Sequence, residues 1–409
     1  SEIAGFVGLL DKQWFFLFIQ LLELIAAWFF WILRKKPPLV IVQSWTSFPK
    51  LWKWIRARYD GHLLISLLTL LVTAGYGVLA WLIVRVPPNN SDSMHTHLAR
   101  VIYWLQQGSF KQLTSHSIFA KIYPFDAQLN VLWTVLFTGT DKFVGFVQFF
   151  AALMIALAIF GICRLLNAQT HTSILVSLIW LMLPLVVFES TTTQFDLVVT
   201  ALFIASVFFF FDYYKQRNRS SLLISGLAMG LAIGTKQTVF MMGPALLVIA
   251  ILIYVQDRHN LSWMMRWIAV VVVSFLLLGS YPFFNNLHYF GNPLGPTDHV
   301  EADSLGSYTF GQKLKYNTPR FIYQYISFDS LPLQVANPAN EFKNQVFTSL
   351  NNAFNLEMEA PVGQKTPDYG FSLAATPRFN EDESWFGFAS TLLLIPALVA
   401  GLIQGLKRK

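Results

Sequence analysis

The chain has 409 residues, of which 55% are hydrophobic and only 12% are charged, about half the charged share of soluble domains. This composition excludes a disordered protein and one organised around nucleic acid. The formal charge of +7 needs no anionic partner, because membrane proteins collect Lys and Arg in cytoplasmic loops. With 16% aromatic residues and a mean hydropathy of +0.49, the chain is predicted to be an all-α polytopic membrane protein surrounded by lipid.

Apolar runs long enough to cross roughly 30 Å of hydrocarbon recur along the sequence. We predict nine membrane spans, some of them short enough to suggest tilting or termination at a water-filled cavity. The predicted spans are 14–33, 62–84, 143–163, 173–188, 197–211, 222–235, 239–254, 267–281 and 385–406.

The basic residues predict the orientation of these spans. When the nine spans are threaded alternately through the membrane, sixteen of the 29 basic residues fall on one side. By the positive-inside rule, that side is cytoplasmic. The opposite side receives two long segments, 87–142 and 282–384, where we expect the chemistry to take place.

The first predicted span differs from the others because Glu23 lies in its middle and aromatic residues gather at both ends. Aromatic belts are typical of membrane interfaces, and a carboxylate inside a span is typical of contact with another helix. Segment 45–59 mixes tryptophan with lysine and arginine, which predicts a helix lying on the anionic inner leaflet. We interpret 1–61 as an added N-terminal region, whose span 14–33 is a candidate surface for other membrane subunits.

The first outer segment is predicted to begin with a surface helix. Ser91 is a suitable N-cap and Gly108 a suitable stop, and between them one helical face carries Asp92 and Arg100. A second carboxylate, Asp126, follows in the same segment. Two carboxylates near a membrane surface can act as a general base and an orienting or metal-binding group, or they can be solvated structural charges.

Two further charges lie near the predicted outer membrane boundary. Asp196 begins the fifth span, where it is either a charge favoured by the helix dipole or a site residue. Lys236 lies between the sixth and seventh spans, where a lysine can bind a phosphate or extend its ammonium to the interface.

Several motifs follow one another in a consistent order. The most specific is Asp92-Ser93-Met94, followed by His97, Arg100 and the run 103–109. The weaker ones are Tyr123-Pro124, Gln194-Phe195-Asp196, Gly226 to Gly230 leading to Lys236, Gly291-Asn292-Pro293-Leu294, and 382–387. In this order, residues 87–389 resemble the polyprenyl-phosphate-sugar-dependent glycosyltransferases of the GT-C superfamily, in their family-39 or protein-mannosyltransferase-like bacterial branch.

The resemblance implies a GT-C-like helix bundle over 62–281, with surface helices in the outer loop 87–142. It further implies an outer, periplasmic loop region over 282–384 and a last span with a basic cytoplasmic tail over 385–409. The implied activity is that of a multi-pass transferase in the bacterial inner membrane. Such an enzyme moves a sugar from a polyprenyl-phosphate donor to an acceptor on the outer face and inverts the anomeric centre. The motifs leave the acceptor unspecified.

The resemblance also implies roles for individual residues. Asp92 would be the general base. Relatives commonly read Tyr-Pro-Pro-Gly-x-Glu, and this chain has Gln128 in place of the glutamate. Asp126 would then substitute for that glutamate as the second catalytic carboxylate. The leaving phosphate needs its charge neutralised. The implied substrate-binding residues are His97, Arg100, Lys121, Gln128, Asp196, Lys236 and Arg320.

Other interpretations remain open at this stage. A catalytically degenerate homologue could serve as a structural subunit of a larger membrane complex, because the glutamate of the common pattern is replaced. A transporter is disfavoured, because Glu23 is the one ionisable residue in the middle of a predicted span. Cys163, the single cysteine, excludes a disulfide framework. His95, His97, His116 and His299 with Asp92 leave a divalent cation open, although they form no ligand motif and no fixed cofactor is predicted.

Overall fold

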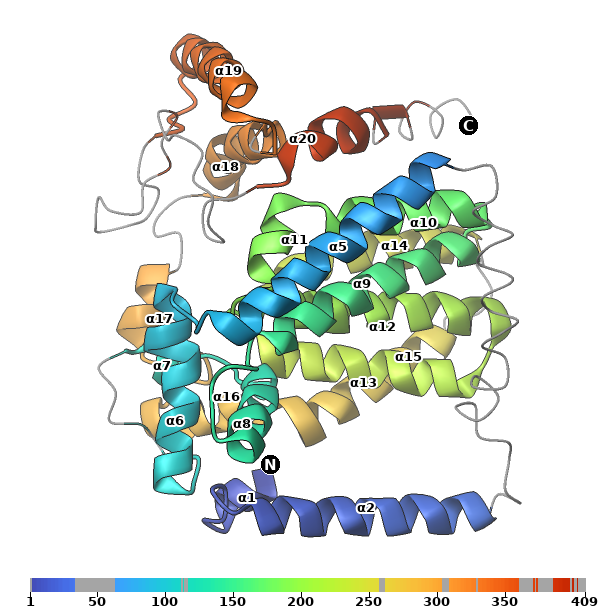
Figure 1. The fold of residues 1–409 in the computed structure, drawn as a ribbon, viewed down its shortest axis with the longest axis vertical. Helices are drawn as coiled ribbons and strands as arrows, with labels where there is room; N and C mark the ends of the chain where they lie inside the picture. Colours follow the sequence, from blue (N-terminus) through green and yellow to red (C-terminus); the bar gives the residue numbers. More distant parts are fainter. Residues whose placement is uncertain are drawn as a thin grey trace. The chain divides into compact units, whose positions relative to one another are not determined.

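The computed structural model describes residues 2–33, 63–111, 113, 117–256, 262–303, 309–328, 330–359, 371, 373, 385–397, 399–400 and 403 (Figure 1). The chain divides into two compact units, one made of Ser1–Leu178 and Thr191–Ser280, the other of Ile179–Ser190 and Tyr281–Lys409. Every regular element in the described residues is a helix, which confirms the predicted all-α class. The predicted helix over 45–59 and His116 lie outside the described residues.

Five helices are long and apolar enough to cross a membrane, which supports a multi-pass membrane protein. They are α2 (Gln13–Leu33), α5 (Leu63–Arg85), α9 (Phe146–Leu165), α12 (Asp196–Gln216) and the joined pair α15 (Ser262–Ser274) and η3 (Phe275–Gly279). The other four predicted spans fall on shorter apolar helices: Thr170–Leu181, Arg219–Thr235, Gln237–Ile251 and Gly387–Ala397. In predicted span 173–188, helix α10 (Thr170–Leu181) stops and Pro184 begins α11 (Pro184–Glu189), because proline lacks the N–H that would continue a helix.

Helix α13 (Arg219–Thr235) packs closely on α15 and η3 through glycines at every fourth position. A Cβ added to Gly226 would overlap the side chain of Val270, and one added to Gly230 would lie 2.6 Å from Ser274 Cβ. Small residues at this spacing let the backbones of two membrane helices approach each other. A hydrogen bond from Trp267 Nε1 to Ser225 Oγ, 2.7 Å long, joins the same helices.

The first outer segment forms four helical elements in the first unit: η1 (Ser93–His97), α6 (Leu98–Gln107), α7 (Phe119–Ile122) and α8 (Asp126–Thr138). The predicted helix between Ser91 and Gly108 is present, but its first turn, η1, has π geometry. Gly108 ends α6 at φ +64°, as expected for a C-terminal glycine.

The N-terminal end of α2 contacts this outer segment. Leu10 N, in the link after α1 (Glu2–Phe6), donates to the Gly108 carbonyl at 3.0 Å, and Gln13 Nε2 donates to the Leu136 carbonyl at 2.6 Å. The predicted topology likewise has α2 start on the side of segment 87–142. The rest of α2 is largely exposed within the chain, Glu23 included.

The second unit contains α11 and the elements that follow Ser280. These are α16 (Tyr281–Phe290), α17 (Thr297–Asp303), α18 (Phe310–Tyr325), α19 (Leu333–Phe354), α20 (Gly387–Ala389) and η5 (Ser390–Leu394). Helices α18 and α19 share a small core of Tyr323 and Phe347 with Met358 and Leu373. Lys343 is buried between them, with its ammonium 3.9 Å from the centre of the Tyr323 ring and 2.9 Å from the Ile326 carbonyl oxygen.

Candidate functional site

The π-helical turn η1, part of the first outer segment, contacts the residues that directly precede α12. Ser93 is fully buried, and its Oγ accepts a 3.2 Å hydrogen bond from Thr193 N. Four residues later, the His97 ring meets the Phe195 ring edge to face, with 4.8 Å between centroids. Single π turns are frequent at functional sites because they redirect the side chains that follow. Asp92, which directly precedes η1, is exposed.

Arg100 organises the buried side of this segment. Its side chain is 1% exposed, and its guanidinium donates to the carbonyl oxygens of Phe119, Ala120 and Tyr123 at 2.6–2.9 Å. Phe119 and Ala120 are the first two residues of α7, and Tyr123 directly follows its last residue; the Phe119 carbonyl also accepts from Tyr123 N. A fourth bond, 2.7 Å long, goes from Nη1 to Gln128 Oε1. Arg100 therefore holds α6, α7 and α8 together, and four of its five N–H groups donate to protein oxygens.

Gln128 connects Arg100 to His97. Its side chain is fully buried, and its Nε2 lies 2.8 Å from His97 Nδ1. Burial, together with the positive charges of Arg100 and Lys236, lowers the pKa of His97 to about 3. Burial also lowers the pKa of Arg100, to about 9, which leaves its guanidinium charged at neutral pH. The site therefore combines a permanent buried cation with a neutral imidazole.

Residue Phe195, directly before α12, has an unusual backbone. Its φ of +69° lies in the left-handed region that glycine favours, although the side chain is bulky and 2% exposed. Such a conformation costs about 1–3 kcal/mol and persists only where its surroundings enforce it, typically at functional sites. From α9, Gln148 Oε1 accepts a 3.1 Å bond from Val198 N and so caps the first turn of α12.

Asp196, which directly follows Phe195, forms an ion pair with Lys236. Lys236 Nζ lies 2.8 and 2.7 Å from the two carboxylate oxygens of Asp196, and both side chains are partly exposed. Asp196 occupies the first turn of α12, and Lys236 follows the last residue of α13. A lysine that is paired and still accessible can exchange its carboxylate for a ligand phosphate.

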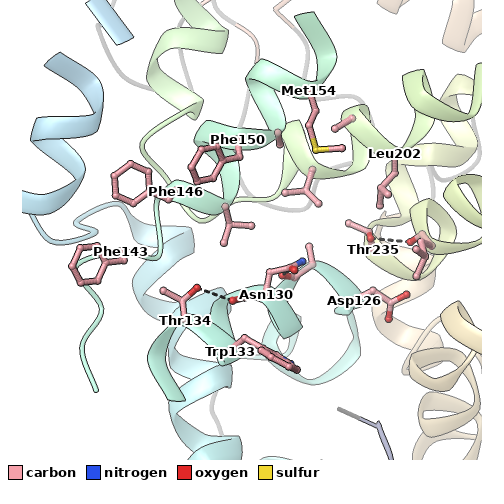
Figure 2. A pocket seen from close by; sticks show the side chains of 16 residues that line it. Asp126, Asn130, Trp133, Thr134, Phe143, Phe146, Phe150, Met154, Leu202 and Thr235 are labelled. Carbon is pink, nitrogen blue, oxygen red and sulfur yellow. Dashed lines mark hydrogen bonds between the residues drawn. The ribbon is translucent and has the colours of Figure 1, made fainter. Parts of the chain in front are cut away.

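A cavity of about 610 Å³ lies between α8, α9, α12 and α13 (Figure 2). Its lining is mostly apolar, and it includes Phe146, Phe150, Met154 and Leu202. Asp126 and Thr235 lie on one side of the cavity in this view, across from Phe143. Two of these four helices, α9 and α12, are long and apolar enough to cross a membrane, and the cavity carries a carboxylate at its margin, which suits an amphiphilic ligand.

Asp126 itself is buried against α13. A Cβ on Gly234 would overlap its carboxylate and come within 2.5 Å of Gly279 Cα. The third glycine of the α13 series therefore makes room for a carboxylate, as well as for η3. Sequence analysis noted this glycine series without assigning it that function.

The predicted site residues do not all meet. His97, Arg100 and Gln128 are joined by hydrogen bonds, Asp196 and Lys236 by an ion pair, and Lys236 influences His97 electrostatically. Lys121 is half-buried on α7, beside the residues whose carbonyls bind Arg100. Arg320 lies in the second unit, where it donates to the carbonyls of Glu357 and Met358, and burial lowers its pKa.

Sequence reasoning assigned no role to Thr193, and it included Phe195 only as part of the motif Gln194-Phe195-Asp196. Thr193 is fully buried, and its Oγ1 makes no hydrogen bond within the described part of the chain. The run of polar residues before predicted span 197–211 was the available signal, whereas nothing in the sequence indicates the left-handed Phe195. Across the residues that the structure describes, no group of three or more His, Cys, Asp or Glu side chains is arranged to hold a metal.

Residues 124–281 match the model of a family described as dolichyl-phosphate-mannose-protein mannosyltransferase. The match covers less than half of the chain and includes Asp126, Gln128, Asp196 and Lys236, while Asp92 and His97 precede it. Over these residues it confirms the resemblance predicted from the motifs and supports a membrane glycosyltransferase of the GT-C type. No curated protein and no solved structure matches the chain.

Proposed function

We propose that this protein transfers a sugar from a polyprenyl-phosphate donor to an acceptor on the outer face of the bacterial inner membrane, with inversion, and that Asp92 is the general base. The match to a family described by a lipid-phosphate sugar supports this class of donor. The observation that carries the proposal is the contact of η1 with Thr193 and Phe195, which brings the segment after Asp92 to the Asp196–Lys236 pair.

The cavity fits the isoprenoid chain of such a donor. Eight of its sixteen lining residues are apolar side chains from α9 and α12, which would bury apolar surface. Its volume of about 610 Å³ lies within the range typical of small-molecule sites. The membrane-spanning length of α9 and α12 is consistent with a ligand that enters from lipid.

Lys236 is the candidate cation for the donor phosphate. In the free protein its ammonium is held by Asp196, and in the complex a phosphate oxygen would take over that contact. The first turn of α12 adds a favourable potential for an anion, because backbone N–H groups at a helix start are only partly satisfied. Arg100 is unsuited to this role, since it is 1% exposed and four of its five N–H groups are bound to protein oxygens.

The proposed reaction is a single displacement at the anomeric carbon. An acceptor hydroxyl oxygen attacks from the face opposite the phosphate and forms the new C–O bond, while its proton moves to the Asp92 carboxylate. The bond between the anomeric carbon and the phosphate oxygen breaks, and its electron pair leaves with the phosphate. Asp92 fits the base because it is exposed and an acceptor can reach it, whereas Asp126 is buried beside the cavity and fits an orienting role on the donor.

The test compares Asp92→Asn with wild type in nanodiscs. Purified protein receives a panel of radiolabelled polyprenyl-phosphate sugars and host membranes as the acceptor source. Loss of the proton acceptor should lower transfer by about 10²- to 10⁴-fold without altering the melting temperature. Asp141→Asn, in the same outer segment, is the matched control and should transfer normally. Equal transfer by Asp92→Asn and wild type would disprove the base assignment.

The exposed middle of α2 favours a second candidate function, that of a structural subunit. Glu23 is exposed within the chain although it lies in the centre of an apolar helix, and a partner helix would satisfy its carboxylate in the membrane. If no sugar of the panel is transferred by wild type, and Glu23→Leu releases membrane proteins that co-purify with it, the subunit function replaces the transferase.

A further inference from the structure

Two histidines of η1 have opposite hydrogen-bonding patterns. His95 is exposed, and its Nδ1 lies 3.0 Å from the Ser91 carbonyl oxygen, which can only accept a hydrogen bond. The hydrogen of the His95 ring is therefore on Nδ1. His97, two residues later, is buried and faces a side-chain amide instead of a carbonyl.

Arg100 determines which way that amide points. A guanidinium only donates, so the Gln128 atom 2.7 Å from Arg100 Nη1 must be the carbonyl oxygen Oε1. The amino group, Nε2, is then the atom that faces His97 Nδ1 at 2.8 Å, and it donates. His97 Nδ1 must accept, and the hydrogen of the neutral ring is consequently on Nε2. The charge of Arg100 thus fixes the tautomer of His97 through Gln128.

The His97 Nε2–H group has no hydrogen-bond partner among the described residues. The ring as a whole is buried, but Nε2 does not belong to the fully buried polar atoms that lack a partner, so a ligand can reach this donor and accept from it. The surroundings are positive, since Lys236 and Arg100 both act on the ring, and an anion is the ligand that such surroundings favour.

We infer that His97 binds an oxygen of a phosphate through a neutral Nε2–H donor, with Gln128 and Arg100 as positioning residues that preset its tautomer. The inference rests on the proposed function for the source of the phosphate, the headgroup of the lipid-linked donor. Lys236 would neutralise that phosphate and His97 would orient it. A neutral imidazole achieves this without retaining the phosphate as strongly as a second cation would.

The tautomer is measured directly on the whole protein in nanodiscs, labelled with ¹⁵N-histidine. The His97 signal is identified by its loss in His97→Asn and His97→Gln. We expect a protonated Nε2 and an unprotonated Nδ1, unchanged in His95→Asn. In Gln128→Glu we expect a protonated Nδ1, because the introduced carboxylate can only accept a hydrogen bond. A protonated Nδ1 in the wild type overturns the inference.

Three probes then identify the ligand: farnesyl phosphate, farnesol and inorganic phosphate. A shift of the His97 Nε2 signal with farnesyl phosphate alone assigns the site to a lipid headgroup, and a shift with inorganic phosphate as well assigns it to phosphate of either source. An equal shift with farnesol, or no shift with any probe, overturns the inference. Turnover is not needed for these measurements. A positive result without sugar transfer would refute the proposed function alone, and normal transfer by a protein whose His97 does not respond would refute this inference alone.

Discussion

The Asp126 carboxylate packs against the backbone of Gly234, where α13 also contacts Gly279. A side chain on Gly234 would displace either the carboxylate or η3, because both occupy the space of the missing Cβ. The position of a candidate site residue is thus tied to the packing of two membrane helices.

Gly234→Ala should therefore destabilise the protein by about 1–3 kcal/mol, the cost of overpacking a close contact, and should weaken binding of farnesyl phosphate. Gly75→Ala in α5 is the matched control, because a Cβ there would meet nothing within 4 Å, and its melting temperature should stay the same or rise. Thermal denaturation in detergent and a binding titration check both. An unchanged Gly234→Ala would mean that α13 and η3 separate at little cost.

The cavity can be tested separately from the headgroup site. Met154 lines it, whereas Leu157, on the same helix, does not line it and is 71% exposed. Met154→Trp should lower the affinity for farnesyl phosphate by about tenfold, because the ring occupies part of the space for the chain, and should leave the affinity for inorganic phosphate unaltered. Leu157→Trp should alter neither. Weaker binding of both ligands to Met154→Trp would indicate a general disturbance of the site.

The ion pair of Asp196 and Lys236 predicts that the charge of Lys236 contributes to the affinity for farnesyl phosphate. Lys236→Met should weaken binding of farnesyl phosphate by about tenfold or more, through loss of a charge-assisted contact, while Lys236→Arg should retain part of the affinity. Lys142→Met removes an exposed lysine of the same outer segment and should bind normally. Isothermal titration at two salt concentrations checks the result, since the wild-type affinity should fall with added salt more steeply than that of Lys236→Met.

His97 predicts a dependence of stability on pH. Its pKa falls from 6.5 to about 3 in the folded protein, because burial, Arg100 and Lys236 all disfavour the imidazolium. Below pH 6.5 the unfolded chain binds a proton that the folded chain does not. The folded state therefore loses up to about 1.4 kcal/mol per pH unit until the pH approaches 3. His97→Asn should flatten the fall of the melting temperature between pH 6.5 and 4.5, whereas His95→Asn should preserve it. Parallel curves for wild type and His97→Asn would contradict the buried neutral ring.

Composition and periodicity were sufficient to predict the helical class and the five long membrane helices, because lipid exposure is recorded in the length of apolar runs. They were insufficient for Arg100, which the helical wheel placed on a polar face with Asp92. The wheel assumes α geometry, while η1 is a π turn, and the partners of Arg100 lie 19–28 residues further along the chain. A pattern of spacings cannot indicate such distant carbonyls.

Charge alone could place Asp196 and Lys236 near the same membrane boundary, but their pairing depends on how α12 and α13 pack. The glycine series that controls this packing can be read from the sequence. Its packing function became clear only from the residues that it contacts in the structure, Val270, Ser274 and Asp126. Local motifs therefore located the segments of the site, and long-range contacts determined which of their residues meet.

The left-handed backbone at Phe195 has a consequence for the evolution of this protein. Glycine would adopt that conformation without strain, a relief of about 1–3 kcal/mol, but loss of a phenylalanine side chain that is 2% exposed costs about 3–5 kcal/mol. The same change would remove the ring that covers His97 and admit water beside the imidazole. Backbone strain and side-chain packing thus favour different residues at this position, and because the packing contribution is the larger, selection for heat tolerance should retain phenylalanine there.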